Sequence, residues 1–233
     1  MCHHSNKDEK WNEKTAMESN REDDTPPSYP NEMMAKIFSS GYYSSNFSAI
    51  KKGQKVLDVG CGFGNNLTFF IDRGCDAYGV DINDEMVRLA KTNLNRLGRN
   101  AHIAVGRNDQ IPFGNGEFDL LISVNTLHYQ YGEEGIDNAL NEFRRVTKEG
   151  GRIFIMTAGP AHEIRSKSKQ LGPFMWEVLD YGFRTGSVLA FFEDREHLQA
   201  VLSKKFSSVE TGMLTEKYSV RTLEFLYAIC LNA

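Results

Sequence analysis

The sequence predicts a doubly wound α/β fold around a mostly parallel sheet. Between residues 55 and 157, short apolar segments typical of buried strands alternate with segments whose apolar residues recur at helical spacing. Five strands that alternate with helices in this way indicate parallel pairing through right-handed crossovers. The first strand ends in three glycines at alternate positions and a helix follows at once, which is typical of the start of a nucleotide site.

Each element of this core has its own pattern. The helix over 84–97 carries its apolar residues on one face and ends before Gly98, a usual helix stop. The segment 118–124 is a nearly continuous apolar run, as expected for a strand that is buried on both faces. The strands are expected at 55–59, 76–80, 101–105, 118–124 and 152–157, the helices at 64–73, 84–97 and 134–146, and a loop at 106–117.

Segments of a different character flank this core. Residues 1–30 are polar and charged, which predicts a partly flexible N-terminal segment. Residues 31–50 carry apolar side chains at helical spacing and are expected to form lid helices. Residues 158–192 are rich in aromatic side chains, and here we expect a helical insertion on the substrate side. The last elements expected are a helix at 193–204 and two antiparallel strands at 206–218 and 222–231. All of 31–233 is expected to form a single domain.

The composition narrows the class of protein. The 233 residues suit one core, and the net charge of -4 argues against a surface built for nucleic acid or an anionic membrane. The N-terminus is polar and no run of about 18 apolar residues occurs, so we expect a cytoplasmic protein without a membrane span. The four cysteines form no C-x-x-C pair, which indicates free thiols. The spacing of His102, His162 and His197 matches no set of metal ligands, so we expect no metal.

The glycine spacing distinguishes two kinds of nucleotide site. The dinucleotide fingerprint is G-x-G-x-x-G, whereas Gly60, Gly62 and Gly64 follow the pattern G-x-G-x-G. The third glycine of the fingerprint lets the helix pack closely beside a pyrophosphate, so its absence disfavours an NAD-dependent oxidoreductase.

At these residues the chain resembles a known family. The segment Val56-Leu57-Asp58-Val59-Gly60-Cys61-Gly62-Phe63-Gly64 is similar to motif I of the class I S-adenosylmethionine-dependent methyltransferases. The resemblance covers residues 55–157, and its further motifs follow in order: Tyr78-Gly79-Val80-Asp81, Ile111-Pro112-Phe113, Phe118-Asp119-Leu120-Leu121, and the helix, Gly-Gly pair and strand of Glu142–Thr157. It implies a Rossmann-like methyltransferase fold with seven strands, the last one antiparallel. It also implies methylation with S-adenosylmethionine as cofactor and S-adenosylhomocysteine as product.

The resemblance and the chemistry of the residues together predict a cofactor site. Asp58 can accept hydrogen bonds from the ammonium of the methionine end; the alternative is a purely structural turn residue. Asp81 can accept from both ribose hydroxyls; the alternative is a cap of the next helix. Where the family often has an acidic residue this chain has Arg107, so Asn108 or Asp109 is expected to contact the adenine. The expected cofactor-binding residues are Asp58, Gly60, Cys61, Gly62, Gly64, Asp81, Ile82, Asn108, Asp109 and Asn125.

The end of the fourth strand predicts the acceptor side, because open α/β sheets bind ligands at the carboxyl ends of their strands. By the resemblance Asn125 lies nearest the cofactor, and His128 is either a general base or a packing residue. Methyl transfer starts from an activated sulfonium, so alignment and desolvation can supply much of the catalysis. We expect Asn125 and His128 as catalytic residues and Tyr42, Tyr43, His128 and Trp176 as substrate-binding residues.

These observations predict an enzyme that transfers a methyl group from S-adenosylmethionine to a small-molecule acceptor by in-line displacement. The alternatives are a protein or RNA acceptor, or a catalytically silent cofactor-binding partner subunit. A monomer or a homodimer is expected. Arg165, Lys167 and Lys169 are interpreted as a solvated helix face, or alternatively as residues that steer an anionic substrate.

Overall fold

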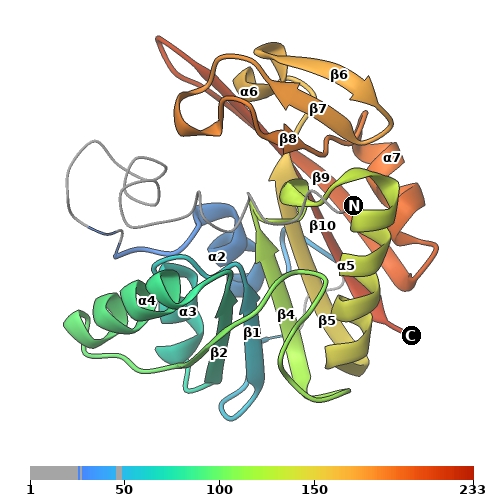
Figure 1. Ribbon diagram of the computed structural model, residues 1–233. Coiled ribbons are helices and arrows are strands. Elements are labelled where there is room, and N and C mark those ends of the chain that lie inside the picture. Colours follow the sequence, from blue (N-terminus) through green and yellow to red (C-terminus); the bar gives the residue numbers. More distant parts are fainter. Residues whose placement is uncertain (1–25, 27, 46–48) are drawn as a thin grey trace. The chain divides into compact units, whose positions relative to one another are not determined.

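The computed structural model describes residues 26, 28–45 and 49–233 (Figure 1). The chain divides into two compact units, Met1–Arg107 and Asn108–Ala233, and each is described by itself. The predicted polar segment over 1–30 falls mainly on residues outside the described part. A single domain over 31–233 stays a prediction.

The first unit contains three parallel strands and the two helices that connect them. β1 (Lys55–Val59) pairs with β2 (Asp76–Asp81), and β2 pairs with β3 (His102–Val105). α3 (Asn65–Ile71) follows β1 and α4 (Asp84–Arg96) follows β2. These five elements confirm the prediction for this part of the chain, with small differences at their ends.

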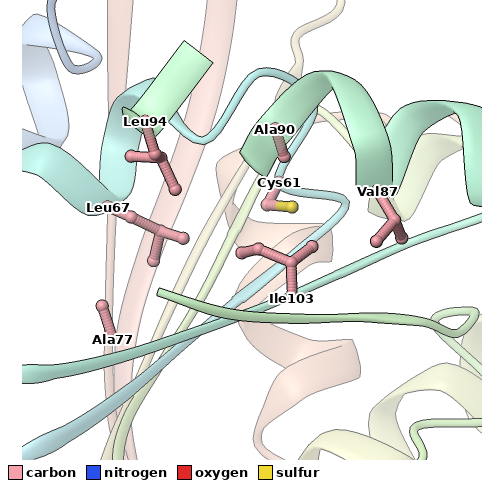
Figure 2. Packing of buried hydrophobic residues seen from close by; sticks show 7 residues of the cluster. All are labelled: Cys61, Leu67, Ala77, Val87, Ala90, Leu94 and Ile103. Carbon is pink, nitrogen blue, oxygen red and sulfur yellow. The ribbon is translucent and has the colours of Figure 1, made fainter. Parts of the chain in front are cut away.

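The two connecting helices pack their apolar faces onto the strands. Figure 2 shows one cluster in which side chains from the glycine turn, both helices and two strands meet. Its members are Cys61, Leu67, Ala77, Val87, Ala90, Leu94 and Ile103. Gly79 is required beside this cluster, because a Cβ there would lie 2.9 Å from the Sγ of Cys61 and 2.8 Å from the Cδ1 of Ile103. The packing therefore holds the glycine turn against β2 through Cys61.

A further helix, α2 (Glu32–Ser39), precedes β1 and confirms the first of the expected helices in 31–50. The side chain of Asn31 caps it by accepting from the backbone N–H of Met34 at 3.0 Å. The backbone N–H of Asn31 donates to the Oδ1 of Asn66 at 2.9 Å and so ties the start of α2 to α3. The second expected helical piece ends at Ile50; its start lies outside the described residues, and Ala49 and Ile50 are not helical.

The second unit contains the other four strands of the large sheet. They are β4 (Phe118–Val124), β5 (Thr147–Ala158), β9 (Phe206–Lys217) and β10 (Thr222–Asn232). β4 pairs with β5 in parallel, and β10 is antiparallel to both β5 and β9. The helical elements outside the insertion are η2 (Leu127–Tyr129), α5 (Gly132–Val146) and α7 (Arg195–Leu202).

The strand order confirms the predicted seven-stranded, mostly parallel sheet. It runs β3-β2-β1-β4-β5-β10-β9, and the last strand of the chain, β10, is the antiparallel one. β5 starts at Thr147 rather than at residue 152, because Thr147 pairs with Phe118 ahead of a register shift. In the described residues, no helix is long and apolar enough to span a membrane.

The insertion over 158–192 differs from the prediction, since its main element is a small sheet. β6 (Ser168–Gly172), β7 (Met175–Val178) and β8 (Val188–Leu189) form a three-stranded antiparallel sheet. Helical turns are limited to α6 (Glu163–Ser166) and η3 (Gly182–Arg184). The prediction of a helical insertion is therefore wrong. Pro173 and Phe174 form the turn between β6 and β7, and the aromatic and branched side chains of β7 favour strand over helix.

Candidate functional site

The turn between β1 and α3 brings three glycines to one place. Gly60, Gly62 and Gly64 have φ values of 75°, 54° and 72°, a left-handed conformation that L side chains rarely adopt. A Cβ at Gly62 would meet no described atom within 4 Å, so the backbone faces open space there. A Cβ at Gly64 would lie 3.0 Å from the side chain of Leu94, so Gly64 permits the contact between turn and α4. Gly62 is thus the glycine at which a ligand can approach the main chain.

Asp81 ends β2 and binds this turn. Its Oδ2 accepts from the backbone N–H of Gly62 at 2.7 Å, and its Oδ1 accepts from that of Ile82 at 2.8 Å. Burial raises the pKa of Asp81, and these two donors oppose that shift. Asn83 caps α4 instead, so the alternative role of Asp81 as a helix cap is wrong. Each carboxylate oxygen has a second lone pair, which leaves Asp81 able to accept two further hydrogen bonds.

Asp58 lies within β1 and is fully buried. Neither of its carboxylate oxygens has a hydrogen-bond partner among the described residues. Burial, followed by the charge of Asp81, raises the pKa of Asp58 to about 8, while the nearby Asn66 side chain lowers it in part. An unpaired buried carboxylate is costly, and a bound cation would remove much of that cost. This argues against a purely structural turn residue at Asp58.

The residues of the first unit fit S-adenosylmethionine. The methionine end of this molecule carries an ammonium, which an unpaired buried carboxylate such as that of Asp58 can bind. Its ribose offers two hydroxyl donors, which the free lone pairs of Asp81 can accept. Burial keeps the thiol of Cys61 neutral by raising its pKa, so the turn adds no second negative charge from Cys61.

Two unpartnered amide oxygens lie in the second unit near the carboxyl end of β4. Asn125 has a left-handed φ of 58°, and its backbone N–H donates to the carbonyl of Met156 at 2.8 Å. The side-chain nitrogen of Asn108 donates to the carbonyl of Thr126 at 3.2 Å. The Oδ1 atoms of Asn125 and Asn108 are buried and have no hydrogen-bond partner among the described residues. Both oxygens can accept a hydrogen bond from a ligand's amino group. Asp109 is half-buried in the same loop.

His128 lies in η2 and is buried. Its Nδ1 lies 3.3 Å from the Oγ1 of Thr157, and its carbonyl accepts from the backbone N–H of Ala190 at 2.7 Å. Burial, with smaller effects of Arg184 and His162, lowers the pKa of His128 to about 3. The imidazole is therefore neutral at neutral pH and a weak base. This geometry favours the packing role over that of a general base.

Some residues in these sites carry no signal in the sequence. Arg184 donates from its Nε to the hydroxyl of Tyr129 at 2.8 Å, although 55 residues separate them. Asn66, beside Asp58, also lies outside any spacing that the glycine pattern could reveal. Contacts of this kind arise only when distant segments fold together.

The remaining predicted residues are divided between the two units. Tyr42 and Tyr43 stand in the first unit with 86% and 42% of their surfaces exposed, and their rings meet edge to face at 5.2 Å. Trp176 lies in β7 of the second unit and lines a cavity. Arg165 lies over the Trp176 ring at 4.6 Å. The interpretation of Arg165, Lys167 and Lys169 as a helix face is wrong, because α6 ends at Ser166 and Lys169 belongs to β6. No group of three or more His, Cys, Asp or Glu side chains in the described part of the chain could hold a metal ion.

Comparisons with known proteins agree with this description. Residues 56–151 match the family model described as "Methyltransferase domain". A ubiquinone/menaquinone biosynthesis C-methyltransferase of Psychromonas ingrahamii is 33% identical over 132 residues, which cover 54% of this chain and 51% of that protein. A fatty-acid O-methyltransferase of Mycolicibacterium smegmatis is 26% identical over 140 residues, covering 59% and 49%. The chain thus spans about half the length of these curated relatives.

A solved structure shows the same fold. The crystal structure of an S-adenosylmethionine-dependent methyltransferase from Methanosarcina mazei has a TM-score of 0.65 with 16% identity, and the match covers 87% of this chain and 98% of that one. The strand order defines a Rossmann-like fold, and the glycine turn with Asp58 and Asp81 is its candidate cofactor site. Residues 56–151 form a methyltransferase domain, and it is of the class I S-adenosylmethionine-dependent type.

Proposed function

We propose that this protein transfers a methyl group from S-adenosylmethionine to a small-molecule acceptor by in-line displacement. The observation that carries the proposal is Asp58, a fully buried carboxylate beside the glycine turn with no hydrogen-bond partner among the described residues. A buried carboxylate is stabilised by a paired cation, and the ammonium of the cofactor supplies that cation.

In this proposal each residue of the first unit has a stated task. Asp58 binds the ammonium, Gly62 lets the cofactor approach the main chain, and Asp81 accepts from the ribose hydroxyls while it holds the turn. Ile82, which follows Asp81, packs on the adenine. Gly60, Cys61 and Gly64 shape the turn.

In the second unit, the unpartnered oxygens of Asn108 and Asn125 accept from amino groups of the ligands. Asn108 is favoured over Asp109 for the adenine, because its Oδ1 is buried and lacks a partner among the described residues. When bound, the cofactor supplies an activated methyl on a sulfonium. The chain then contributes mainly alignment and exclusion of water. Because the pKa of His128 is low, the proton of the acceptor passes to solvent rather than to this imidazole.

The similarity to proteins named for C-methylation in quinone biosynthesis and O-methylation of fatty acids supports a small acceptor. The net charge of -4 argues against RNA, and a cytoplasmic monomer or homodimer stays our prediction.

Calorimetry tests the proposal directly. The full chain is titrated with S-adenosylmethionine, S-adenosylhomocysteine and NAD. We expect both adenosyl ligands to bind and NAD not to bind. Binding of NAD alone would overturn the proposal. Methylation of small-molecule extracts but not of protein or RNA then separates the acceptor classes, and cofactor binding without any methyl transfer would indicate a silent partner subunit.

A further inference from the structure

A cavity of about 530 Å³ lies within the second unit. Its walls come from the first turn of α5, from the insertion and from the start of α7. The residues that matter here are Glu133, Arg165, Phe174, Trp176, Phe191 and Glu193. This volume is within the usual range for sites that bind small molecules. The tasks assigned above to the cofactor residues do not require this cavity.

Aromatic side chains form the apolar walls of the cavity. The rings of Trp176 and Phe191 meet edge to face at 5.9 Å. The ring of Phe174 lies 5.2 Å from that of Phe192 and 5.0 Å from that of His197. Phe174 and Phe191 are buried, so packing fixes their orientation. The aromatic surface left for a ligand therefore comes mainly from Trp176, which is not buried.

Two carboxylates in the cavity are unpaired. Glu133 lies in the first turn of α5 and Glu193 precedes α7. Neither carboxylate forms a hydrogen bond or an ion pair with a described residue. Among the described residues that line the cavity, only Arg165 carries a fixed positive charge. It lies 4.6 Å from the centre of the Trp176 ring and donates to the carbonyl of Phe192 at 3.2 Å. Arg165 is thus engaged with the wall, while both carboxylates remain free for a ligand.

We propose that this cavity binds a small organic cation, an ammonium group on an apolar body. Glu133 and Glu193 attract the charge, and the half-buried ring of Trp176 packs against the apolar body. All of these residues belong to the second unit. Trp176 is also a predicted acceptor-binding residue, but the proposal does not depend on methyl transfer. Its test uses no cofactor, so either proposal can fail without the other.

The fluorescence of Trp176 can report binding. The chain contains two tryptophans, so Trp11→Phe leaves Trp176 as the sole source of the signal. Three probes of similar shape differ in charge: 2-phenylethylamine is a cation at pH 7, 2-phenylethanol is neutral and 3-phenylpropanoate is an anion. We expect saturable changes with the amine, which binds about fivefold or more tightly than the alcohol, and the weakest response with the anion.

Glutamine variants test whether the negative charges of Glu133 and Glu193 cause the preference for the amine. The double change Glu133→Gln and Glu193→Gln should bring the affinities for amine and alcohol together, and added salt should do so in part because these carboxylates are exposed. Glu134→Gln is the matched control, since Glu134 is an exposed neighbour in the same first turn of α5 that does not line the cavity. It should leave the preference for the amine unchanged.

Three results would overturn the proposal. The anion could bind as tightly as the amine, which would assign the cavity to Arg165 instead. The preference for the amine could survive in the double variant while its circular dichroism spectrum matches that of the parent. Finally, none of the three probes could change the fluorescence of Trp176.

Discussion

The carboxylate of Asp81 accepts a hydrogen bond from the backbone N–H of Gly62 at 2.7 Å. Through this bond, the end of β2 fixes the middle of the glycine turn that follows β1. Asp81 also accepts from the backbone N–H of Ile82, so one side chain contacts both the turn after β1 and the loop after β2. The same carboxylate adds to the high pKa of Asp58. Asp81 therefore holds the glycine turn in place and favours the protonated form of Asp58.

Replacing Asp81 tests its role in cofactor binding. We expect Asp81→Ala to weaken binding of S-adenosylhomocysteine by about 1–3 kcal/mol, because charge-assisted hydrogen bonds are lost. Calorimetric Kd values measure the effect. Asp84→Ala is the control, since Asp84 is exposed on the first turn of α4 and should leave the Kd unchanged. An unaltered Kd in Asp81→Ala would remove Asp81 from the site.

A pair of glycine variants separates backbone strain from contact with the ligand. Gly62 and Gly98 both have positive φ, of 54° and 68°, and a Cβ at either would meet no described atom within 4 Å. We expect both Gly62→Ala and Gly98→Ala to lower the free energy of unfolding by about 1–2 kcal/mol, the cost of a left-handed L residue. Only Gly62→Ala should also weaken cofactor binding. Equal Kd values for the two variants would show that the turn does not face the ligand.

Asp58 predicts proton release on cofactor binding. With a pKa of about 8, its carboxyl is mostly protonated at pH 7 in the free protein. A bound ammonium favours the ionised form, so binding of S-adenosylhomocysteine at pH 7 should release close to one proton per ligand, and less above pH 8. Calorimetry in buffers of different ionisation enthalpy measures this number. Asp58→Asn should bind more weakly and release none, whereas unchanged release would assign the proton to another group.

The carboxyl group of Asp58 also makes the free energy of unfolding depend on pH when no cofactor is bound. The folded-state pKa of Asp58 is about 8 and the unfolded value is 3.8, so the folded state holds the proton across this interval. Stability from this group is fully present below pH 3.8 and is lost as pH rises to about 8, by at most about 1.4 kcal/mol per pH unit. Urea unfolding between pH 5 and pH 8 should show a smaller decline in Asp58→Asn than in the parent.

The buried imidazole of His128 makes a contribution to stability that changes with pH in the opposite direction to that of Asp58. Its folded-state pKa of about 3 lies below the unfolded value of 6.5, so only the unfolded state gains a proton between these values. The contribution of His128 therefore falls as pH decreases from 6.5 towards 3 and opposes the gain from Asp58, so His128→Gln should gain more stability than the parent over this interval. Urea unfolding between pH 6.5 and pH 4.5 measures the slope. His102→Gln is the control at an exposed position, and an equal slope in all three proteins would contradict the prediction.

The periodic part of the fold is predictable from sequence because burial imposes a local pattern. β1 and β4 match the expected ranges residue for residue, since apolar runs bounded by charged or glycine residues define buried strands. The insertion was predicted wrongly because its aromatic residues have no clear period, and pairing between β6 and β7 decides their structure. The expected roles of Tyr42, Tyr43 and Trp176 stay predictions.

The sequence by itself determined the order of strands and helices, the glycine turn and the two carboxylates at the ends of neighbouring strands. These features depend on residues close together in the chain, where period and turn chemistry act directly. Only the tertiary structure decided that Asp58 is buried without a partner among the described residues, that Asp81 bonds Gly62, and that Glu133 and Glu193 share one cavity with Trp176. Burial and charge at a site are set by segments distant in sequence, because desolvation depends on everything that packs around a group.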